Sequence, residues 1–153
     1  MAVPKSKTVA TWLALTLGSL GLHRFYLHGL SDRLAWLHPW PTLLGLYGVQ
    51  RMDLLGQDDR LSWLLMPLLG LMLVQAMICG IVYGLTPDER WDRQRNAGRS
   101  SGPSGWTAII GVVACVLLGG TVLMTTIAFS AQRYFENEAQ QQQQQSGNPE
   151  TGH

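Results

Sequence analysis

The sequence predicts an all-α integral membrane protein, a helical bundle of about four transmembrane helices. Two observations lead to this fold class. Charged residues make up only 14% of the 153 residues, against roughly 25% in soluble domains. No charged residue occurs from Leu61 to Pro87 or from Ser100 to Gln132. Each run is longer than the roughly 20 residues that an apolar helix needs to cross a bilayer.

Four apolar segments account for the expected helices. The first extends to Leu30 if the long side chain of Arg24 reaches the membrane surface. The second is the least apolar, and its helix is expected to begin near Pro41, because proline is tolerated in a first helical turn. Gln75 is strongly polar within the third and is expected to form a helix–helix hydrogen bond. The segments are Thr8–Leu22, Leu34–Leu55, Leu61–Leu85 and Trp106–Phe129.

The chain therefore divides into five parts. The connector between the third and fourth helices is polar and ends in serine and glycine, which indicates flexibility. The tail holds a run of six glutamines and buries too little apolar surface to fold, so it is expected to be disordered. The parts are a two-transmembrane-like helical hairpin (1–57), a third transmembrane helix (58–87), the connector (88–105), a fourth transmembrane helix (106–130) and the Gln-rich tail (131–153).

The membrane orientation is nearly balanced under a four-helix arrangement. With four crossings, Lys5, Lys7, Arg51, Arg60 and Arg133 share the side of the N-terminus, and the other six basic residues lie opposite. The positive-inside rule then gives no clear bias. The arginine-rich connector is expected to be cytoplasmic. The first segment also has the length of a signal-peptide core, but the bulky residues that follow it argue against cleavage.

One stretch carries a specific pattern, Gly18-Ser-Leu-Gly21-Leu-His23-Arg24-Phe25-Tyr26-Leu27. It joins the first apolar segment to a second one that ends near Asp53. This arrangement resembles the two-transmembrane ("TM-two") domain family, in which two helices flank a Gly-x-His-Arg-Phe-Tyr-Leu-Gly turn. The resemblance covers about residues 5–55. It departs from the family at two positions. His28 stands in place of the last glycine, and Arg51 stands where an apolar or aromatic residue is common.

The resemblance implies a membrane protein and carries no reaction with it. Gly21, His23, Arg24, Phe25, Tyr26 and Asp53 are the motif and structural residues that we single out. Arg24 near the membrane edge needs a partner or water, because an unpaired charge at depth costs roughly 2.5–3.5 kcal/mol on insertion scales. Asp53 is the nearest candidate from the second helix. The helix lengths separate the two groups unless the first helix extends, so coupling between them is a hypothesis.

Small residues recur at every fourth position in three of the segments. This spacing allows close helix–helix contact in lipid. We expect helix packing at Ala10, Ala14 and Gly18, at Ala76, Gly80 and Gly84, and at Gly111, Cys115 and Gly119.

The sequence offers no catalytic constellation, so we expect no enzyme, no cofactor and no metal. His23, His28 and His38 could serve as haem or metal ligands, which leaves a membrane redox protein as a minor alternative. No basic stripe indicates nucleic-acid binding. The leading hypothesis is a small multi-pass protein of a cell membrane, of the bacterial inner-membrane type. It would act through helix packing and association with itself or other membrane proteins, with the lipid bilayer as its other partner. The alternative is a component of a transporter or channel.

Overall fold

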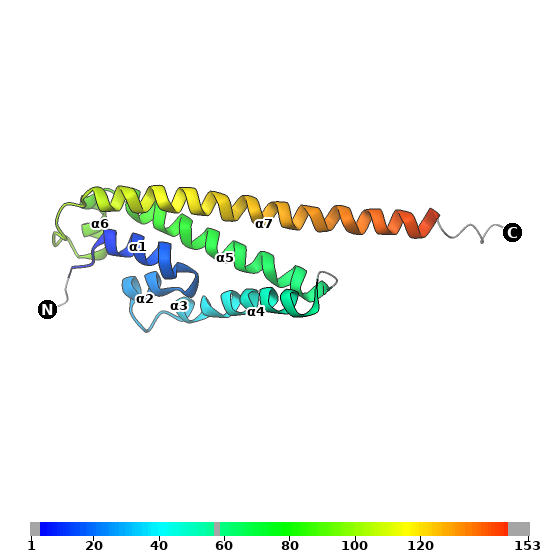
Figure 1. Cartoon of the computed structure of the whole chain (residues 1–153). Helices are drawn as coiled ribbons and strands as arrows, with labels where there is room; N and C mark the ends of the chain where they lie inside the picture. The colour runs from blue at the N-terminus through cyan, green and yellow to red at the C-terminus, as the bar shows by residue number, and fades with distance from the viewer. Residues whose placement is uncertain (1–3, 57–58, 147–153) are drawn as a thin grey trace.

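The computed structural model describes residues 4–56 and 59–146, and in that part of the chain the regular structure is entirely helical. Figure 1 shows α1, α5 and α7 running in roughly one direction, with α7 the longest. The elements are α1 (Lys7–Leu17), the 3₁₀ turn η1 (Gly18–Leu20), α2 (Leu22–His28), α3 (Arg33–Leu37), α4 (Pro39–Leu55), α5 (Arg60–Leu85), α6 (Asp88–Arg95) and α7 (Trp106–Ser146).

Helix α5 is the central element, and α1 packs antiparallel against its C-terminal part. Gly18 lies so close to α5 that a Cβ placed on it would be 2.7 Å from the Cβ of Ala76. One turn earlier, the Cβ of Ala14 lies beside Gly80. At the start of α1, the Lys7 Nζ donates to the carbonyl oxygen of Thr86, just beyond the end of α5 (2.8 Å). Helix α1 therefore covers α5 from its end back to about Ala76.

Helix α4 packs antiparallel against the other part of α5. A Cβ on Gly45 would lie 2.5 Å from the Cβ of Leu69, and a Cβ on Gly48 would lie 2.6 Å from that of Leu65. These two glycines are one turn apart, so they let the two backbones approach on one face of α4. Helices α1 and α4 thus lie end to end along α5, with α7 beside α5 as well (Figure 1).

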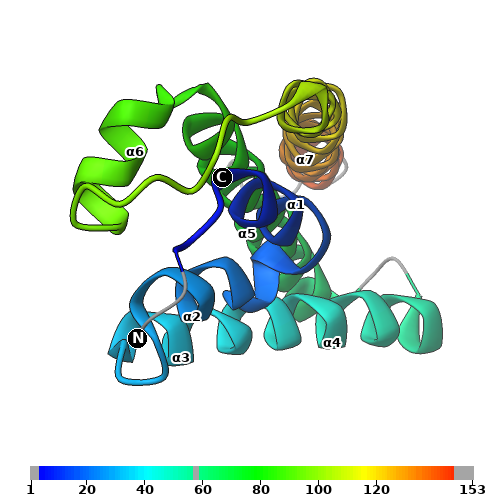
Figure 2. The same ribbon diagram turned by 90° about the vertical axis from the view of Figure 1, so that its left-hand side faces the viewer.

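The short elements η1, α2 and α3 fill the break between α1 and α4. The expected first segment does not continue as one helix, because Gly21 adopts a left-handed conformation (φ +79°) and reverses the chain. His38 has helical dihedrals (φ −59°, ψ −41°), so α3 leads directly into α4. Figure 2, a view from the end of the bundle, shows α4 inclined to α7 and α6 set to one side of α5.

Helix α4 begins at Pro39, two residues before the expected start, because α3 precedes it without an extended linker. Two aspartates cap the helices that follow loops. Asp32 accepts from the Leu34 backbone N–H at the start of α3 (3.0 Å). Asp59 accepts from the backbone N–H of Ser62 at the start of α5 (3.1 Å). Such caps satisfy donors that the first helical turn leaves free.

Helix α7 is longer than the sequence indicated. It passes the start of α5, where Phe129 stacks on Trp63 at 4.1 Å between ring centroids, and continues to Ser146. The expected disordered tail is therefore helical as far as Ser146, and residues 147–153 lie outside the described part. Glutamine, glutamate and alanine are good helix formers. Pairs one turn apart, such as Gln132 with Glu136 (2.8 Å), support a helix that has already been nucleated.

Candidate functional site

The His-Arg-Phe-Tyr motif lies at the break between α1 and α4. Gly21 is required there on two counts. Its left-handed φ disfavours other residues, and a Cβ would lie 2.8 Å from the Cβ of His38 and 3.0 Å from the carbonyl oxygen of Ala35. The turn that Gly21 forms sends α2 back along α1, so the motif side chains face α1, α5 and α6 as well as α3.

His23 is buried at this break, with 1% of its surface exposed. Its ring lies between those of His38 and Tyr83, at centroid distances of 5.9 and 5.8 Å. Its Nδ1 atom has no hydrogen-bond partner among the described residues. Buried polar atoms are nearly always paired, so this ring nitrogen is an exception within the described part of the chain.

His38 and Gln75 form the polar contact between α4 and the middle of α5. The Nδ1 atom of His38 lies 3.0 Å from the Leu34 carbonyl oxygen, and its Nε2 lies 3.0 Å from the Gln75 Nε2. Because a carbonyl only accepts, Nδ1 carries the hydrogen, and Nε2 accepts from the Gln75 amide. Gln75 thus makes the helix–helix hydrogen bond expected of it. The Thr42 hydroxyl donates to the Ser19 carbonyl beside this pair (2.6 Å).

Arg24, Phe25 and Tyr26 point to different neighbours along α2. Arg24 forms an ion pair with Asp32, with 3.0 Å between Nη2 and Oδ2. Phe25 packs edge-to-face on Trp36 at 5.3 Å between centroids. The Tyr26 hydroxyl oxygen accepts from the Ser6 backbone N–H (2.9 Å). The motif therefore ties α2 to α3 on one side and to the start of the chain on the other.

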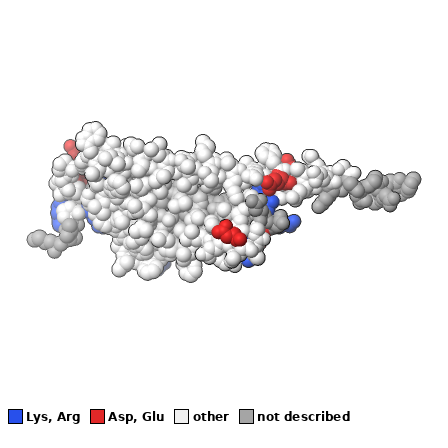
Figure 3. All heavy atoms as spheres, viewed as in Figure 1, with Lys and Arg blue, Asp and Glu red and all other residues white. Residues whose placement is uncertain are grey.

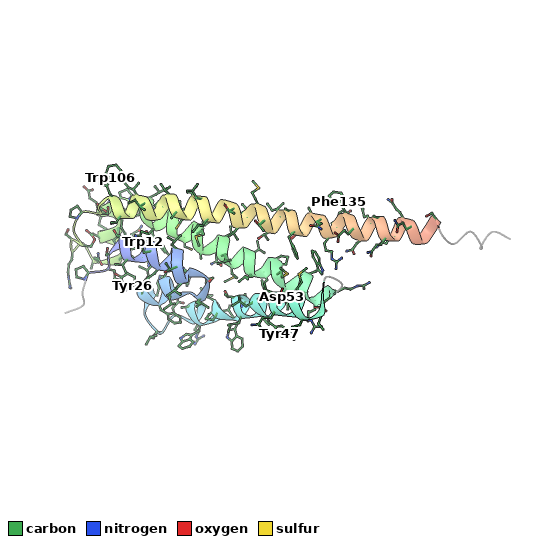
Figure 4. The ribbon with its side chains drawn as sticks, in the orientation of Figure 1. Trp12, Tyr26, Tyr47, Asp53, Trp106 and Phe135 are labelled. Carbon is green, nitrogen blue, oxygen red and sulfur yellow. The ribbon has the colours of Figure 1, made fainter. Side chains whose placement is uncertain are left out.

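Asp53 does not meet Arg24. Asp53 is exposed near the end of α4, and Figure 4 shows it toward the opposite end of the bundle from Tyr26, which lies on the same short helix as Arg24. The direct pairing considered from the sequence is therefore absent, and Asp32 takes its place. Asp32 follows Arg24 by eight residues, across the loop after α2, and precedes α3, a cap position that was visible in the sequence as Asp before an apolar helical run.

A short N-terminal strap, residues 4–6, crosses the end of the bundle and is held by α6. The Lys5 carbonyl accepts from the Trp91 Nε1 (2.7 Å), and the Lys5 backbone N–H donates to the Asn96 Oδ1 (2.7 Å). The Lys5 Nζ donates to the Leu27 carbonyl at the end of α2 (2.5 Å). Trp91 is 2% exposed and packs with Ala10 and Leu27. Sequence reasoning placed Trp91 in a flexible connector and missed this role.

An ion pair and several hydrogen bonds hold the same end of the bundle together. Lys7 forms an ion pair with Asp88 (2.7 Å), and the Ser104 backbone N–H and hydroxyl both donate to Asp88. The hydrogen bond from Lys7 and those from Ser104 lower the pKa of the Asp88 carboxyl. Asp92 is held in the same way by Ser101 and then by Asn96, which lowers its pKa. The connector is therefore an ordered helix and loop at this end.

The nine packing residues singled out from the sequence lie on faces that meet one another. Gly18 meets Ala76, and Gly80 lies beside both Ala14 and Cys115. The remaining members behave similarly: Gly84 lies beside Thr11 and Val112, Gly111 beside Thr11 and Trp12, and Gly119 beside Met77, while Ala10 is fully buried. Helices α1, α5 and α7 therefore approach one another closely through small residues at successive turns along their axes.

The three histidines considered as haem ligands do not converge. His23 and His38 are neighbours, whereas His28 lies at the far end of α2, where its Nε2 is 2.9 Å from the Arg95 Nη1. His23 is covered by protein on nearly all sides. Among the described residues, no group of three or more His, Cys, Asp or Glu side chains is placed to hold a metal ion.

The fold and this motif define an all-helical protein with two helices, α5 and α7, that are long and apolar enough to cross a membrane. A model of the TM2 domain matches residues 3–49. The resemblance stated from the sequence is thereby confirmed for this segment, and it indicates a membrane protein. Searches of curated proteins and of solved structures give no match to the chain.

Proposed function

We propose that the chain is a multi-pass integral protein of the cell membrane, with the middle of the bundle in the hydrocarbon core. The supporting observation is the distribution of charge. In the view of Figure 3, charged side chains gather toward the two ends of the packed helices, and the surface between them is uncharged. Helices α5 and α7 expose large apolar side chains along this band, including Leu71, Val82, Leu117 and Met124. Water would penalise such a surface, whereas lipid solvates it.

Alkaline carbonate washing of membranes tests the embedding. An integral protein stays in the pellet, because the hydrocarbon core holds its apolar band. Release into the supernatant together with a peripheral marker protein would show that the bundle only adheres to the surface.

Within the membrane, we propose that the chain acts by associating with itself or with another membrane protein, and not by catalysis. The support is the lack of a catalytic constellation in the sequence and the large apolar side chains that α5 and α7 leave exposed, since the small-residue contacts described above are made within the chain. Purification in mild detergent tests this proposal. Light scattering then measures the mass of the protein complex after the contribution of the detergent is subtracted. A stoichiometric assembly is expected, and a monomer that carries no partner out of native membranes would contradict it.

A transporter or channel component is the second candidate, and one observation favours it. The polar groups of Ser19, His23, His38, Thr42 and Gln75 meet where α1 stops and α4 begins. Broken helices that meet inside a bundle are the places where transporters bind their solutes. Proton flux tests this candidate. It is measured in liposomes that hold the purified protein and a trapped pH dye, with a potassium gradient and valinomycin to set the membrane potential. Proton flux above that of empty liposomes, which falls in His23→Gln, would favour transport over association.

A further inference from the structure

We infer that residues 7–28 form a re-entrant helical hairpin and that the chain crosses the membrane three times, with its termini on opposite sides and the α6 end in the cytoplasm. This inference rests on the proposed embedding. It differs from the four crossings with both termini on one side that the apolar segments alone suggest. Helix α5 has 26 residues and is therefore about 39 Å long, so positions along it give the depth of the other helices in the bilayer.

The first step is that α1 stops halfway. Residues of α1 contact the α5 segment only between Ala76 and Thr86. Beyond Ala76, the face of α5 is taken over by α4, beginning with the contact between His38 and Gln75 (3.0 Å). Helix α1 has 11 residues, about 17 Å of axial length, which is too short to cross a core of about 30 Å.

The second step is that α2 returns to the end where α1 began. Three contacts fix its C-terminal turn to that end. The Tyr26 hydroxyl meets the Ser6 backbone, the Leu27 carbonyl meets the Lys5 ammonium, and His28 meets Arg95 of α6. Residues 5 and 28 therefore lie at the same end of the bundle, and the chain between them enters and leaves there.

The third step is that α3 and α4 together form the first complete crossing. The helical dihedrals of His38 join them into one run from Arg33 to Leu55, roughly 34 Å long. This run begins beside the Arg24–Asp32 ion pair and ends beside the Arg51–Asp59 ion pair. Its inclination in Figure 2 suits a helix somewhat longer than the hydrocarbon is thick. Helices α5 and α7 provide the second and third crossings.

The distribution of basic residues supports the same arrangement independently. Three crossings place eight of the eleven lysines and arginines at the α6 end and three at the other. Four crossings divide them five to six. Basic residues concentrate on the cytoplasmic side of membrane proteins, so the three-crossing arrangement has a clear orientation. The eight are Lys5, Lys7, Arg24, Arg33, Arg90, Arg93, Arg95 and Arg99, and the three are Arg51, Arg60 and Arg133.

One cysteine added at a time at four exposed positions tests the inference in the full chain: Pro4→Cys, Ser31→Cys, Gln94→Cys and Gln142→Cys. Intact and permeabilised cells are treated with a membrane-impermeant maleimide. The unaltered protein, with Cys79 half-buried and Cys115 buried, is the background control. We expect Gln142→Cys to react in intact cells, and the other three only after permeabilisation.

The outcomes separate the inference from the embedding on which it rests. Reaction of Pro4→Cys and Ser31→Cys from opposite sides would overturn the hairpin, because a complete crossing would then lie between them. Reaction of all four positions from one side would instead overturn the embedding. A reversed pattern, with only Gln142→Cys protected in intact cells, would keep the hairpin and overturn the orientation.

Discussion

Arg51 and Asp59 form a two-pronged ion pair across the link between α4 and α5. The Arg51 Nε lies 2.6 Å from Oδ2 of Asp59, and Nη2 lies 3.1 Å from Oδ1. The same carboxylate caps α5 through the backbone N–H and hydroxyl of Ser62. The guanidinium of Arg51, followed by the Ser62 hydroxyl, holds the pKa of Asp59 well below its usual range. One residue thus starts a helix and fixes its orientation to the previous helix.

Breaking this pair should lower the melting temperature in detergent. Asp59→Asn keeps an acceptor for the cap but removes the charge, so it isolates the ion pair. A double-mutant cycle with Arg51→Gln should show strong coupling, whereas Arg51→Gln with Asp53→Asn should be additive. Asp53 is the matched control because its carboxylate is exposed and has no ion pair within the described residues. Additive effects for the first pair would contradict this geometry.

The same pair predicts an acid dependence. Because the pKa of Asp59 is lowered by folding, its stabilising contribution is complete above the unfolded pKa of about 3.9 and is lost as the pH falls toward the folded pKa. The unaltered protein should therefore lose more melting temperature between about pH 6 and pH 3 than Asp59→Asn does. Equal losses in the two proteins would show that other carboxylates carry the acid sensitivity.

Gly45 should not tolerate a methyl group. A Cβ there would lie 2.5 Å from the Cβ of Leu69 and 2.8 Å from its backbone nitrogen. Gly45→Ala should therefore force α4 from α5 and destabilise the bundle by about 1–3 kcal/mol, as overpacking does. Gly120→Ala is the control, because nothing lies within 4 Å of its Cβ position in α7. The control should be neutral or stabilising by up to about 1 kcal/mol. Equal melting temperatures for both variants would contradict the close approach.

Trp91 should be the anchor of the connector. Replacing it with alanine removes a buried indole that packs with Ala10 and Leu27, at a cost of roughly 3–5 kcal/mol. Trp91→Phe keeps most of the packing and loses the bond to the Lys5 carbonyl, so it should cost about 1 kcal/mol. Hydrogen exchange of the Asn96 and Lys5 amides measures the release of the strap. Unchanged exchange in Trp91→Ala would show that the strap does not depend on α6.

Removing the chain after Glu138 should leave the bundle intact. Arg133, whose guanidinium carbon lies 3.9 Å above the Trp63 ring, is near the last contact of α7 with α5. Figure 4 shows Phe135 already beyond the other helices. The truncated protein should accumulate in membranes and melt at the same temperature, with lower helical circular dichroism. A lower melting temperature would mean that the projecting part of α7 contributes to the bundle.

Long uncharged runs and a specific motif could be identified from the sequence, because burial in lipid dictates composition over many residues. The apolar runs predicted the starts of α5 and α7 to within a few residues, and the motif predicted the match of residues 3–49 to the TM2 domain. The reversal at Gly21 was not apparent, since one left-handed glycine has no periodic signature. The ion pairs of Arg24 and Arg51 were also missed. They depend on where loops bring Asp32 and Asp59, which requires the relative placement of helices.

The end-to-end arrangement of α1 and α4 affects how the nascent chain can mature. Gly18 rests on Ala76 and Ala14 lies beside Gly80, residues that leave the ribosome about 60 positions later, within seconds at typical synthesis rates. Until then, the face of α1 that packs on α5 in the finished protein has no protein surface to cover it. The first helix to be synthesised therefore cannot reach its final position until α5 has been made. A chaperone or the insertion machinery has that interval in which to hold it.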